Sequence, residues 1–182
     1  MKPLPDVLGP GLRVLFCGIN PSLLSAERGH HFARPGNRFW PALHGAGFTP
    51  RRLSPDEDGL LPALGLGITN VADRPTRAAA ELTDDELRAG FARLEALVAR
   101  ERPGVVAMVG LGAWRVVSGR RGAGGGLQPE TIAGRPVWVL PNTSGLNANH
   151  QLPELVRRFA ELRSYSLDSF QQTSHSTGTV PP

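Results

Sequence analysis

The chain has 182 residues and a formal net charge of +4 at pH 7, and 40% of its residues are hydrophobic. This length suits one domain with a full core and is short for two. No apolar run is long enough to span a bilayer, and residues 1–10 lack the apolar stretch of a signal peptide, so we expect a cytoplasmic protein. The single cysteine, Cys17, excludes a disulfide framework and a multi-cysteine metal site.

Arginine supplies almost all of the positive charge, because Lys2 is the only lysine. Arginine binds phosphate groups bidentately and stacks on bases, so a polyanionic partner fits this composition, although a coding bias would produce it equally well. No predicted strand or loop offers a lysine for Schiff-base chemistry.

The first third of the chain is predicted to contain a strand, a long loop and two helices. Residues 13–17 form an apolar run typical of a buried strand, and residues 21–35 show no helical period and are predicted to be a loop. Asn37 can cap a helix that ends at Gly47, and a short helix is predicted over residues 55–64.

The middle of the chain alternates between strands and helices. An apolar run over residues 67–71 predicts a second strand, and Thr83-Asp84-Asp85-Glu86 is a capping box that starts a helix reaching about Arg102. A third strand is predicted over residues 105–109, and a helix over residues 111–118.

The last third begins with residues 120–126, which are rich in glycine and arginine and are predicted to form a flexible loop. A fourth strand over residues 137–140 and a helix over residues 152–163 follow. From residue 164 onward the composition shifts to Ser, Thr, Gln and Pro, so residues 164–182 are predicted to be a disordered tail.

Strands that are continuously apolar and that alternate with helices indicate a parallel sheet covered on both faces. The fold class predicted for residues 1–163 is therefore α/β, a single three-layer α/β/α domain with a mainly parallel central sheet. In such a sheet, loops that leave the carboxyl ends of strands meet at one edge, where ligands bind. The loops 18–22 and 142–147 each follow a predicted strand, so we expect them to face the same ligand.

Four motifs in order carry a resemblance to a known family. They are Phe16-Cys17-Gly18-Ile19-Asn20-Pro21, Phe32-Ala33-Arg34-Pro35-Gly36-Asn37-Arg38-Phe39-Trp40, Asp73-Arg74-Pro75-Thr76 and Val139-Leu140-Pro141-Asn142-Thr143-Ser144-Gly145-Leu146. Over roughly residues 12–163, the chain resembles the mismatch-specific uracil-DNA glycosylases, the bacterial relatives of thymine-DNA glycosylase.

This resemblance implies a uracil-DNA glycosylase fold and a monomer that acts on double-stranded DNA with no metal and no cofactor. The family removes uracil and related bases, preferentially opposite guanine, and leaves an abasic site. Because the scissile bond lies inside the duplex, the nucleotide must be flipped into a pocket.

The resemblance assigns roles around the flipped base. Asn20 matches the catalytic asparagine, which holds a water below the sugar C1′, and Phe32 matches the aromatic residue that stacks on the base. The backbone N–H groups of Ile19 and Phe32 are expected to bind the carbonyl edge of uracil. Ser25 corresponds to a serine near the 5-position of the pyrimidine, and Asn70 stands where the best-known bacterial relatives have a lysine.

Each of these residues also has a simpler structural role. Asn20 could cap the turn before Pro21, and Phe32 could be an ordinary core residue. Asp73 could stabilise the sugar cation or assist the water, but it could equally pair with Arg74 or Arg77.

The second loop resembles the element that fills the space left by the flipped nucleotide. Leu146 matches the residue that enters the base stack, and backbone groups of Gly145 and Asn147 are expected to read the orphan guanine. Asn142 and Ser144 are expected to contact flanking phosphates. A leucine buried against the core is the simpler interpretation of Leu146.

This loop departs from the family pattern at three positions. Asn147 stands where a serine is common. Thr143 stands where a proline is usual, which predicts a less rigid loop. His150 stands close to the position where the family often has an arginine, and we expect it to contact a phosphate. The histidines show no repeated spacing, so no metal site is predicted.

Three functions compete at this point. The first is a monofunctional DNA glycosylase with no lyase activity, because lyase chemistry needs an amine. The second is a module that binds damaged or mismatched DNA with little turnover. The third is an unrelated small-molecule enzyme, but the sequence shows neither a dinucleotide fingerprint nor a paired acid and base.

Overall fold

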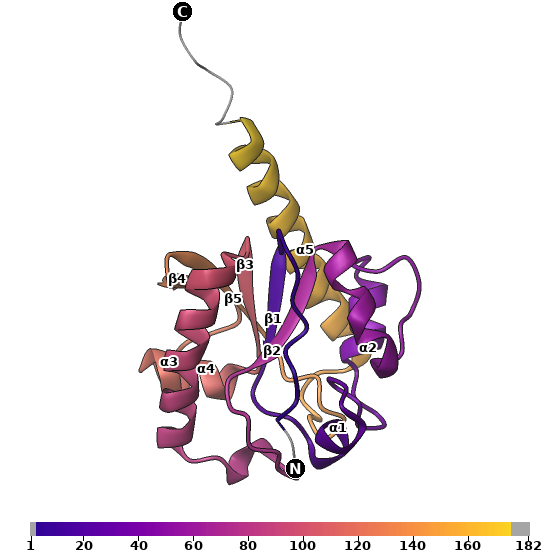
Figure 1. The fold of residues 1–182 in the computed structure, drawn as a ribbon, viewed down its shortest axis with the longest axis vertical. Coiled ribbons are helices and arrows are strands. Elements are labelled where there is room, and N and C mark those ends of the chain that lie inside the picture. The colour runs from indigo at the N-terminus through magenta and orange to yellow at the C-terminus, as the bar shows by residue number, and fades with distance from the viewer. Residues whose placement is uncertain (1–2, 176–182) are drawn as a thin grey trace, which may run out of the picture.

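One mixed sheet forms the centre of the structure, a computed structural model that describes residues 3–175. The strand order is β2-β1-β3-β5-β4, in which β4 runs antiparallel to β5 and the other neighbours are parallel (Figure 1). The strands are β1 (Val14–Gly18), β2 (Leu66–Asn70), β3 (Val105–Val109), β4 (Gly126–Ile132) and β5 (Arg135–Leu140).

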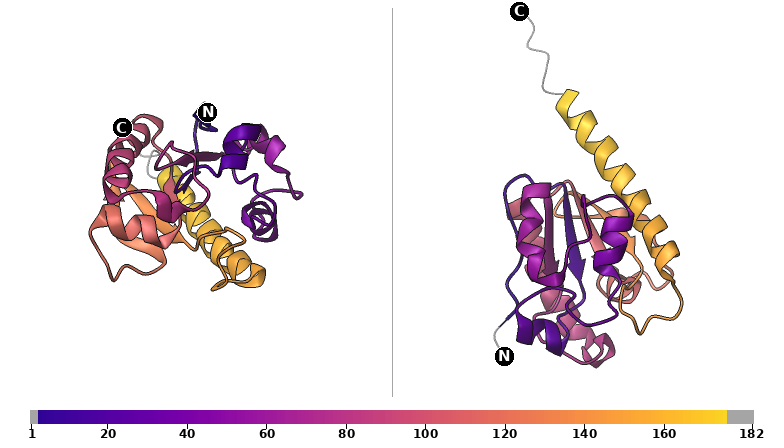
Figure 2. Two further views of the ribbon diagram at one scale, coloured as in Figure 1. Left: turned by 90° about the horizontal axis from the view of Figure 1, so that it is seen from below. Right: turned by 90° about the vertical axis from the view of Figure 1, so that its right-hand side faces the viewer.

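Helices cover both faces of the sheet, with α3 and α4 on one side and α2 and α5 on the other (Figures 1 and 2). The α-helices are α1 (Leu23–Arg28), α2 (Phe39–Gly45), α3 (Asp84–Glu101), α4 (Leu111–Ser118) and α5 (Leu152–His175). Three short 3₁₀ helices are η1 (Pro55–Leu60), η2 (Pro62–Leu64) and η3 (Ala79–Glu81). Within residues 3–175, no helix has the length and apolar character needed to cross a membrane.

Alternating side chains of β1 build the two halves of the core. Val14 and Phe16 join the cluster that includes residues of α2 and α5, whereas Leu15 and Cys17 join the cluster that includes residues of α3 and α4. All four are fully buried or nearly so, which explains the continuous apolar run in the sequence. The predicted fold class, a three-layer α/β/α domain with a mainly parallel sheet, is confirmed.

Several predicted elements appear close to their expected bounds. The predicted strands correspond to β1, β2, β3 and β5. The capping box at the start of α3 is present, because the hydroxyl of Thr83 accepts a hydrogen bond from the Glu86 N–H at 3.2 Å. The side chain of Asn37 accepts a hydrogen bond from the N–H of Phe39 at 2.9 Å, at the start of α2.

The sequence analysis missed β4. Its sequence includes Gln128, Pro129 and Glu130, which hide the apolar alternation of a strand. Proline is tolerated because β4 is an edge strand, and the pairing register with β5 shifts between Leu127 and Thr131. The predicted flexible loop therefore ends at Gly126, where β4 begins.

The long loop predicted over residues 21–35 is wrong in part, because it contains α1. Ser22 caps this helix by accepting a hydrogen bond from the Ser25 N–H, and Gly29 ends it in the left-handed conformation. A helix of six residues is too short to show a detectable apolar period.

The helix α5 does not stop at residue 163 but continues to His175. Tyr165 packs against Trp138 of β5, with ring centroids 5.3 Å apart, and Ser166 is buried. The polar composition after residue 163 gave no sign of the Tyr165–Trp138 contact or of the burial of Ser166. The helical residues 164–175 correct the first part of the predicted disordered tail, and residues 176–182 lie outside the described part of the chain.

Replacing Tyr165 with alanine should lower the melting temperature by about 2–8 °C, because the contact with Trp138 is lost. Thermal unfolding followed by circular dichroism measures this shift. Ser164→Ala is the matched control, since Ser164 is exposed on the same turn of α5 and should leave the melting temperature unchanged. Equal melting temperatures for both variants would show that residues beyond 163 do not stabilise the fold.

Candidate active site

A cavity of about 740 Å³ opens at the carboxyl ends of the parallel strands. It receives residues that follow β1, β2, β3 and β5, and β1 lies where the strand order reverses, which is the usual ligand site of an open α/β sheet. All predicted site residues except Asp73 and Gly145 line it: Ile19, Asn20, Ser25, Phe32, Asn70, Asn142, Ser144, Leu146, Asn147 and His150.

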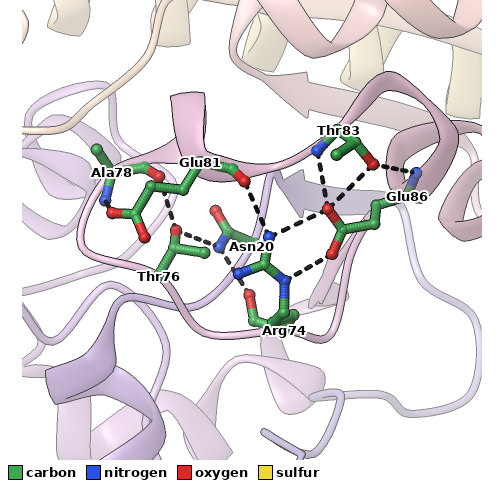
Figure 3. Close-up of polar contacts among 7 residues, drawn as sticks. All are labelled: Asn20, Arg74, Thr76, Ala78, Glu81, Thr83 and Glu86. Carbon is green, nitrogen blue, oxygen red and sulfur yellow. Dashed lines mark hydrogen bonds and ion pairs between the residues drawn. The ribbon is translucent and has the colours of Figure 1, made fainter.

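Both amide hydrogens of Asn20 are held by the loop that follows β2. Its Nδ2 donates to the carbonyl oxygen of Arg74 at 2.8 Å and to the hydroxyl oxygen of Thr76 at 2.7 Å. A main-chain carbonyl can only accept, so the atom that faces Arg74 must be the amide nitrogen. The side-chain oxygen of Asn20 is thereby left as an acceptor, and none of the other residues drawn in Figure 3 donates to it.

Thr76 completes this arrangement, although the sequence analysis gave it no role. Its hydroxyl donates to the carbonyl oxygen of Ala78 at 2.8 Å, so its lone pairs face the Asn20 amide (Figure 3). The motif that contains Thr76 was identified from the sequence, but only the structure shows that its side chain lies against Asn20.

Phe32 has an aromatic partner on one ring face and lines the cavity. Its ring stacks on Phe39 of α2, with centroids 4.0 Å apart and an interplanar angle of 16°. Its backbone adopts φ = 52°, a left-handed conformation that is unfavourable for a residue with a side chain. Such strain persists only where the surrounding structure enforces it, and it is common at functional sites.

Neighbouring residues shape the surroundings of Phe32. The buried hydroxyl of Ser25 accepts a hydrogen bond from the N–H of Ala33 at 3.0 Å, which joins the loop to α1. Gly18 leaves room for the side chain of Asn70, because a Cβ atom there would lie 2.5 Å from the side-chain oxygen of Asn70, whereas its distance of 3.4 Å from the Phe32 ring is an ordinary contact. Ser25 thus positions the loop, and its expected role near the 5-position of a base stays a prediction.

Asn70 is buried at the end of β2, and His31 fixes the direction of its amide. His31 Nε2 lies 2.8 Å from the carbonyl oxygen of Pro5, so this nitrogen carries the proton. The other ring nitrogen, Nδ1, then accepts from Asn70 Nδ2 at 3.4 Å. Burial lowers the pKa of His31, which favours the neutral ring that this arrangement requires.

The structure does not bring Asp73 into the cavity. Its carboxylate is half exposed and pairs with Arg93 of α3 at 2.9 Å, rather than with Arg74 or Arg77. The catalytic role suggested for Asp73 is therefore not supported by its position. Arg93 also donates to the main-chain oxygens of Asn70 and Val71, so the pair ties the loop after β2 to α3.

Leu146 stands at the tip of a tight turn, with 66% of its surface exposed. The N–H of Asn147 donates to the carbonyl oxygen of Ser144 at 2.9 Å, and the side chain of Asn147 donates to the carbonyl oxygen of Asn142 at 2.9 Å. A core role for Leu146 is excluded by this exposure. Gly145 is required for the close approach of a second loop, since a Cβ atom would lie 2.8 Å from the carbonyl oxygen of Gly36.

Arg38 holds this turn by its main-chain oxygens, a role that the sequence analysis did not assign. Its guanidinium donates to the carbonyl oxygens of Ser144 at 2.7 Å and Asn147 at 2.9 Å, and also to that of His150. The turn is fixed further by Thr143, which is buried.

The expectation that Thr143 loosens the loop is therefore not supported. Its hydroxyl donates to the side-chain oxygen of Asn37 at 2.9 Å, and its carbonyl oxygen accepts from the Arg38 N–H at 2.9 Å. These hydrogen bonds give a threonine the tethering effect that a proline ring would supply by restricting φ.

Positive charge borders the cavity. Arg34 and Arg77 both line it, and no carboxylate within residues 3–175 lies within ion-pair distance of either. Unpaired guanidinium groups at a cavity mouth suit phosphate oxygens. No group of three or more His, Cys, Asp or Glu side chains in the described residues could hold a metal ion.

Comparison with known proteins agrees with this geometry. The family model of the Uracil DNA glycosylase superfamily matches residues 5–164. The fold is similar to the solution NMR structure of a candidate uracil DNA glycosylase from Methanosarcina acetivorans, with a TM-score of 0.58 and 20% sequence identity over 89% of this chain and 98% of that chain. The structural likeness supports the fold, and the family match extends over most of the sequence. The chain therefore belongs to the uracil DNA glycosylase superfamily, whose members are hydrolases that act on DNA containing uracil.

Proposed function

We propose that this protein is a monofunctional glycosylase that flips uracil out of duplex DNA, preferentially opposite guanine, and hydrolyses the N-glycosidic bond to leave an abasic site. The observation that carries this proposal is the orientation of Asn20. Its amide hydrogens are both engaged, and its free oxygen belongs to the cavity where a flipped nucleotide would lie.

An amide oxygen is a weak base, so Asn20 contributes by position. It accepts a hydrogen bond from a water and holds that water below C1′ of the sugar. In a dissociative reaction the base leaves first and a sugar cation forms. This cation is reactive enough for a neutral water to add to it, so the water needs to be placed more than activated. The proton of the water passes to bulk solvent after the new C–O bond begins to form.

The departing uracil carries the electron pair of the broken bond. Backbone N–H groups of Ile19 and Phe32 are the proposed donors that stabilise this anion. Stacking of the base on the Phe32 ring adds about 1–3 kcal/mol of binding free energy.

Asn70 is suited to distinguish uracil from cytosine. With one amide hydrogen on His31, it can still offer one hydrogen and its oxygen to a base. Uracil presents a matching N3–H donor and O4 acceptor, whereas cytosine presents the reverse pair. Because His31 fixes the amide direction, Asn70 cannot turn over to accept cytosine without losing its partner.

The turn around Leu146 supports action on duplex DNA. An exposed leucine on a tethered turn can enter the base stack and offset the few kcal/mol lost when a base is unstacked. Backbone groups of Gly145 and Asn147 are the proposed contacts to the orphan guanine. Asn142, Ser144 and His150 are proposed to contact the flanking phosphates.

The scarcity of lysine disfavours lyase chemistry. The sequence holds one lysine, Lys2, outside the described residues, so no lysine among residues 3–175 can form a Schiff base with the abasic sugar. The reaction is therefore proposed to stop at the abasic site.

Single-turnover cleavage of end-labelled duplexes tests the proposed function. Duplexes with G·U, A·U or G·T and single-stranded uracil are incubated with the enzyme, and half of each sample is then treated with alkali. Strand breaks should appear only after alkali and fastest for G·U. Breaks without alkali would reveal a lyase, and equal rates for G·U and single-stranded uracil would remove the role in guanine recognition.

Asn20→Ala should lower the single-turnover rate on G·U duplexes by at least about 100-fold, because the water loses its orienting acceptor. Binding to the same duplex, measured by fluorescence anisotropy, should change little. Retained binding together with unchanged, negligible turnover in the wild type and the variant would instead indicate a mismatch-binding module.

Leu146→Ala should slow the cleavage of G·U duplexes about tenfold and leave single-stranded uracil unaffected, because only a duplex has a stack to enter. Leu127→Ala provides the matched control, since Leu127 is a comparably exposed leucine on β4. A similar loss on both substrates would mean that Leu146 acts within the base pocket instead.

A further inference from the structure

The peptide group that holds Asn20 has little main-chain support. The N–H of Thr76 donates to the carbonyl oxygen of Pro21 at 3.2 Å, and main-chain hydrogen bonds fix the start of the loop beside β1. Between these anchors, the main-chain groups of residues 73–75 make no hydrogen bond to another main-chain group in the described part of the chain. The position of the Arg74 carbonyl therefore depends on side chains.

The Asp73–Arg93 ion pair holds the residue before Arg74, and the side chain of Arg74 itself supplies the second anchor. Its Nε donates to Glu86 Oε1 at 2.6 Å, and its Nη2 donates to Glu86 Oε2 at 3.1 Å. The same Nη2 also donates to the carbonyl oxygen of Glu81 at 2.9 Å (Figure 3). A bidentate ion pair of this kind fixes direction as well as distance.

Glu86 is itself held in place by the first turn of α3. Its Oε2 accepts from the N–H of Thr83 at 2.8 Å and from the Thr83 hydroxyl at 3.1 Å (Figure 3). The same carboxylate thus completes the capping box of α3 and forms the ion pair with Arg74. A continuous path therefore runs from the first turn of α3 to the amide of Asn20. Hydrogen bonds join Thr83 to Glu86, Glu86 to the Arg74 guanidinium and the Arg74 carbonyl to Asn20, and the covalent frame of Arg74 links the last two.

We propose that Glu86 is a positioning residue that sets the orientation of the Asn20 amide through Arg74. This inference rests on the proposed function, in which Asn20 orients the water. Glu86 lies at the far end of this path and acts by keeping the Arg74 carbonyl in place.

The charge on Glu86 is retained wherever the enzyme is expected to work. Hydrogen bonds from Arg74 and then from Thr83 lower the pKa of Glu86 to about 2. Because the pKa is lowered, the carboxylate stays ionised and the ion pair is complete at every pH above the ordinary pKa of glutamate. The ion pair is lost only as the pH falls toward 2. The contribution of Glu86 to the rate should therefore be constant from about pH 5 upward.

The pair is exposed enough to be removed without unfolding the protein. The side chains of Arg74 and Glu86 are 49% and 33% exposed, and exposed ion pairs contribute little to global stability. Arg120 and Glu130 form a second ion pair with nearly equal exposure, 42% and 33%, on the loop before β4 and on β4, in which one guanidinium nitrogen donates to both carboxylate oxygens. Neither of these residues lines the cavity, so Glu130 is a matched control.

The test compares Glu86→Ala and Glu86→Gln with Glu130→Ala and Glu130→Gln. Glu86→Ala should lower the single-turnover rate on G·U duplexes about tenfold and leave the dissociation constant unchanged. Glu86→Gln preserves the capping box and should show a smaller loss. Both Glu130 variants should cleave at the wild-type rate.

A second measurement does not depend on turnover. In proteins labelled with ¹⁵N-asparagine, the side-chain amide signals of Asn20 are identified by their loss in Asn20→Ala. Exchange of these amide hydrogens with solvent should be faster in Glu86→Ala and unchanged in Glu130→Ala.

The two measurements separate the two claims. Equal exchange in both alanine variants, or a raised dissociation constant with an unchanged rate in Glu86→Ala, would overturn the positioning role. If the wild type cleaves no uracil duplex, the proposed function is wrong, and the exchange comparison still decides whether Glu86 orients Asn20.

Discussion

The hydrogen bonds that fix the amide of Asn20 are the constraint on which the candidate site depends. An amide that orients a water must present its oxygen in one direction, and a free asparagine side chain has no such preference. Two acceptors from the loop after β2 remove this freedom. The parallel pairing of β1 with β2 is what brings residues more than fifty positions apart into contact.

The same principle operates around the cavity. His31 directs the amide of Asn70, and Ser25 anchors the loop that holds Phe32 in its left-handed conformation. In each case a buried polar side chain with a defined donor and acceptor pattern sets the geometry of a neighbour that faces the cavity. Preorganisation of this kind lowers the reorganisation needed when a ligand arrives.

The sequence was sufficient to predict the fold class and the four parallel strands, and most of the site residues that it suggested line the cavity. These features follow from apolar runs and from motifs beside strand ends, which are local signals. It could not predict β4, whose proline and polar residues hide its pattern, or the extension of α5, which depends on the contact between Tyr165 and Trp138. The ion-pair partner of Asp73 could not be predicted either, because Arg93 lies twenty positions away on another element.

Arg38 contacts the turn that carries Leu146 through main-chain oxygens alone. Arg38 therefore fixes the turn from outside, and polar side chains of the turn fix it from within. The side chain of Leu146, at the tip, takes no part in these hydrogen bonds. Substitutions at its tip can alter what the turn presents to DNA without altering its path. Under the proposed function, such a separation of shape from chemistry would let the part of the loop that contacts DNA diverge during evolution, or be redesigned, while the surroundings of Asn20 are preserved.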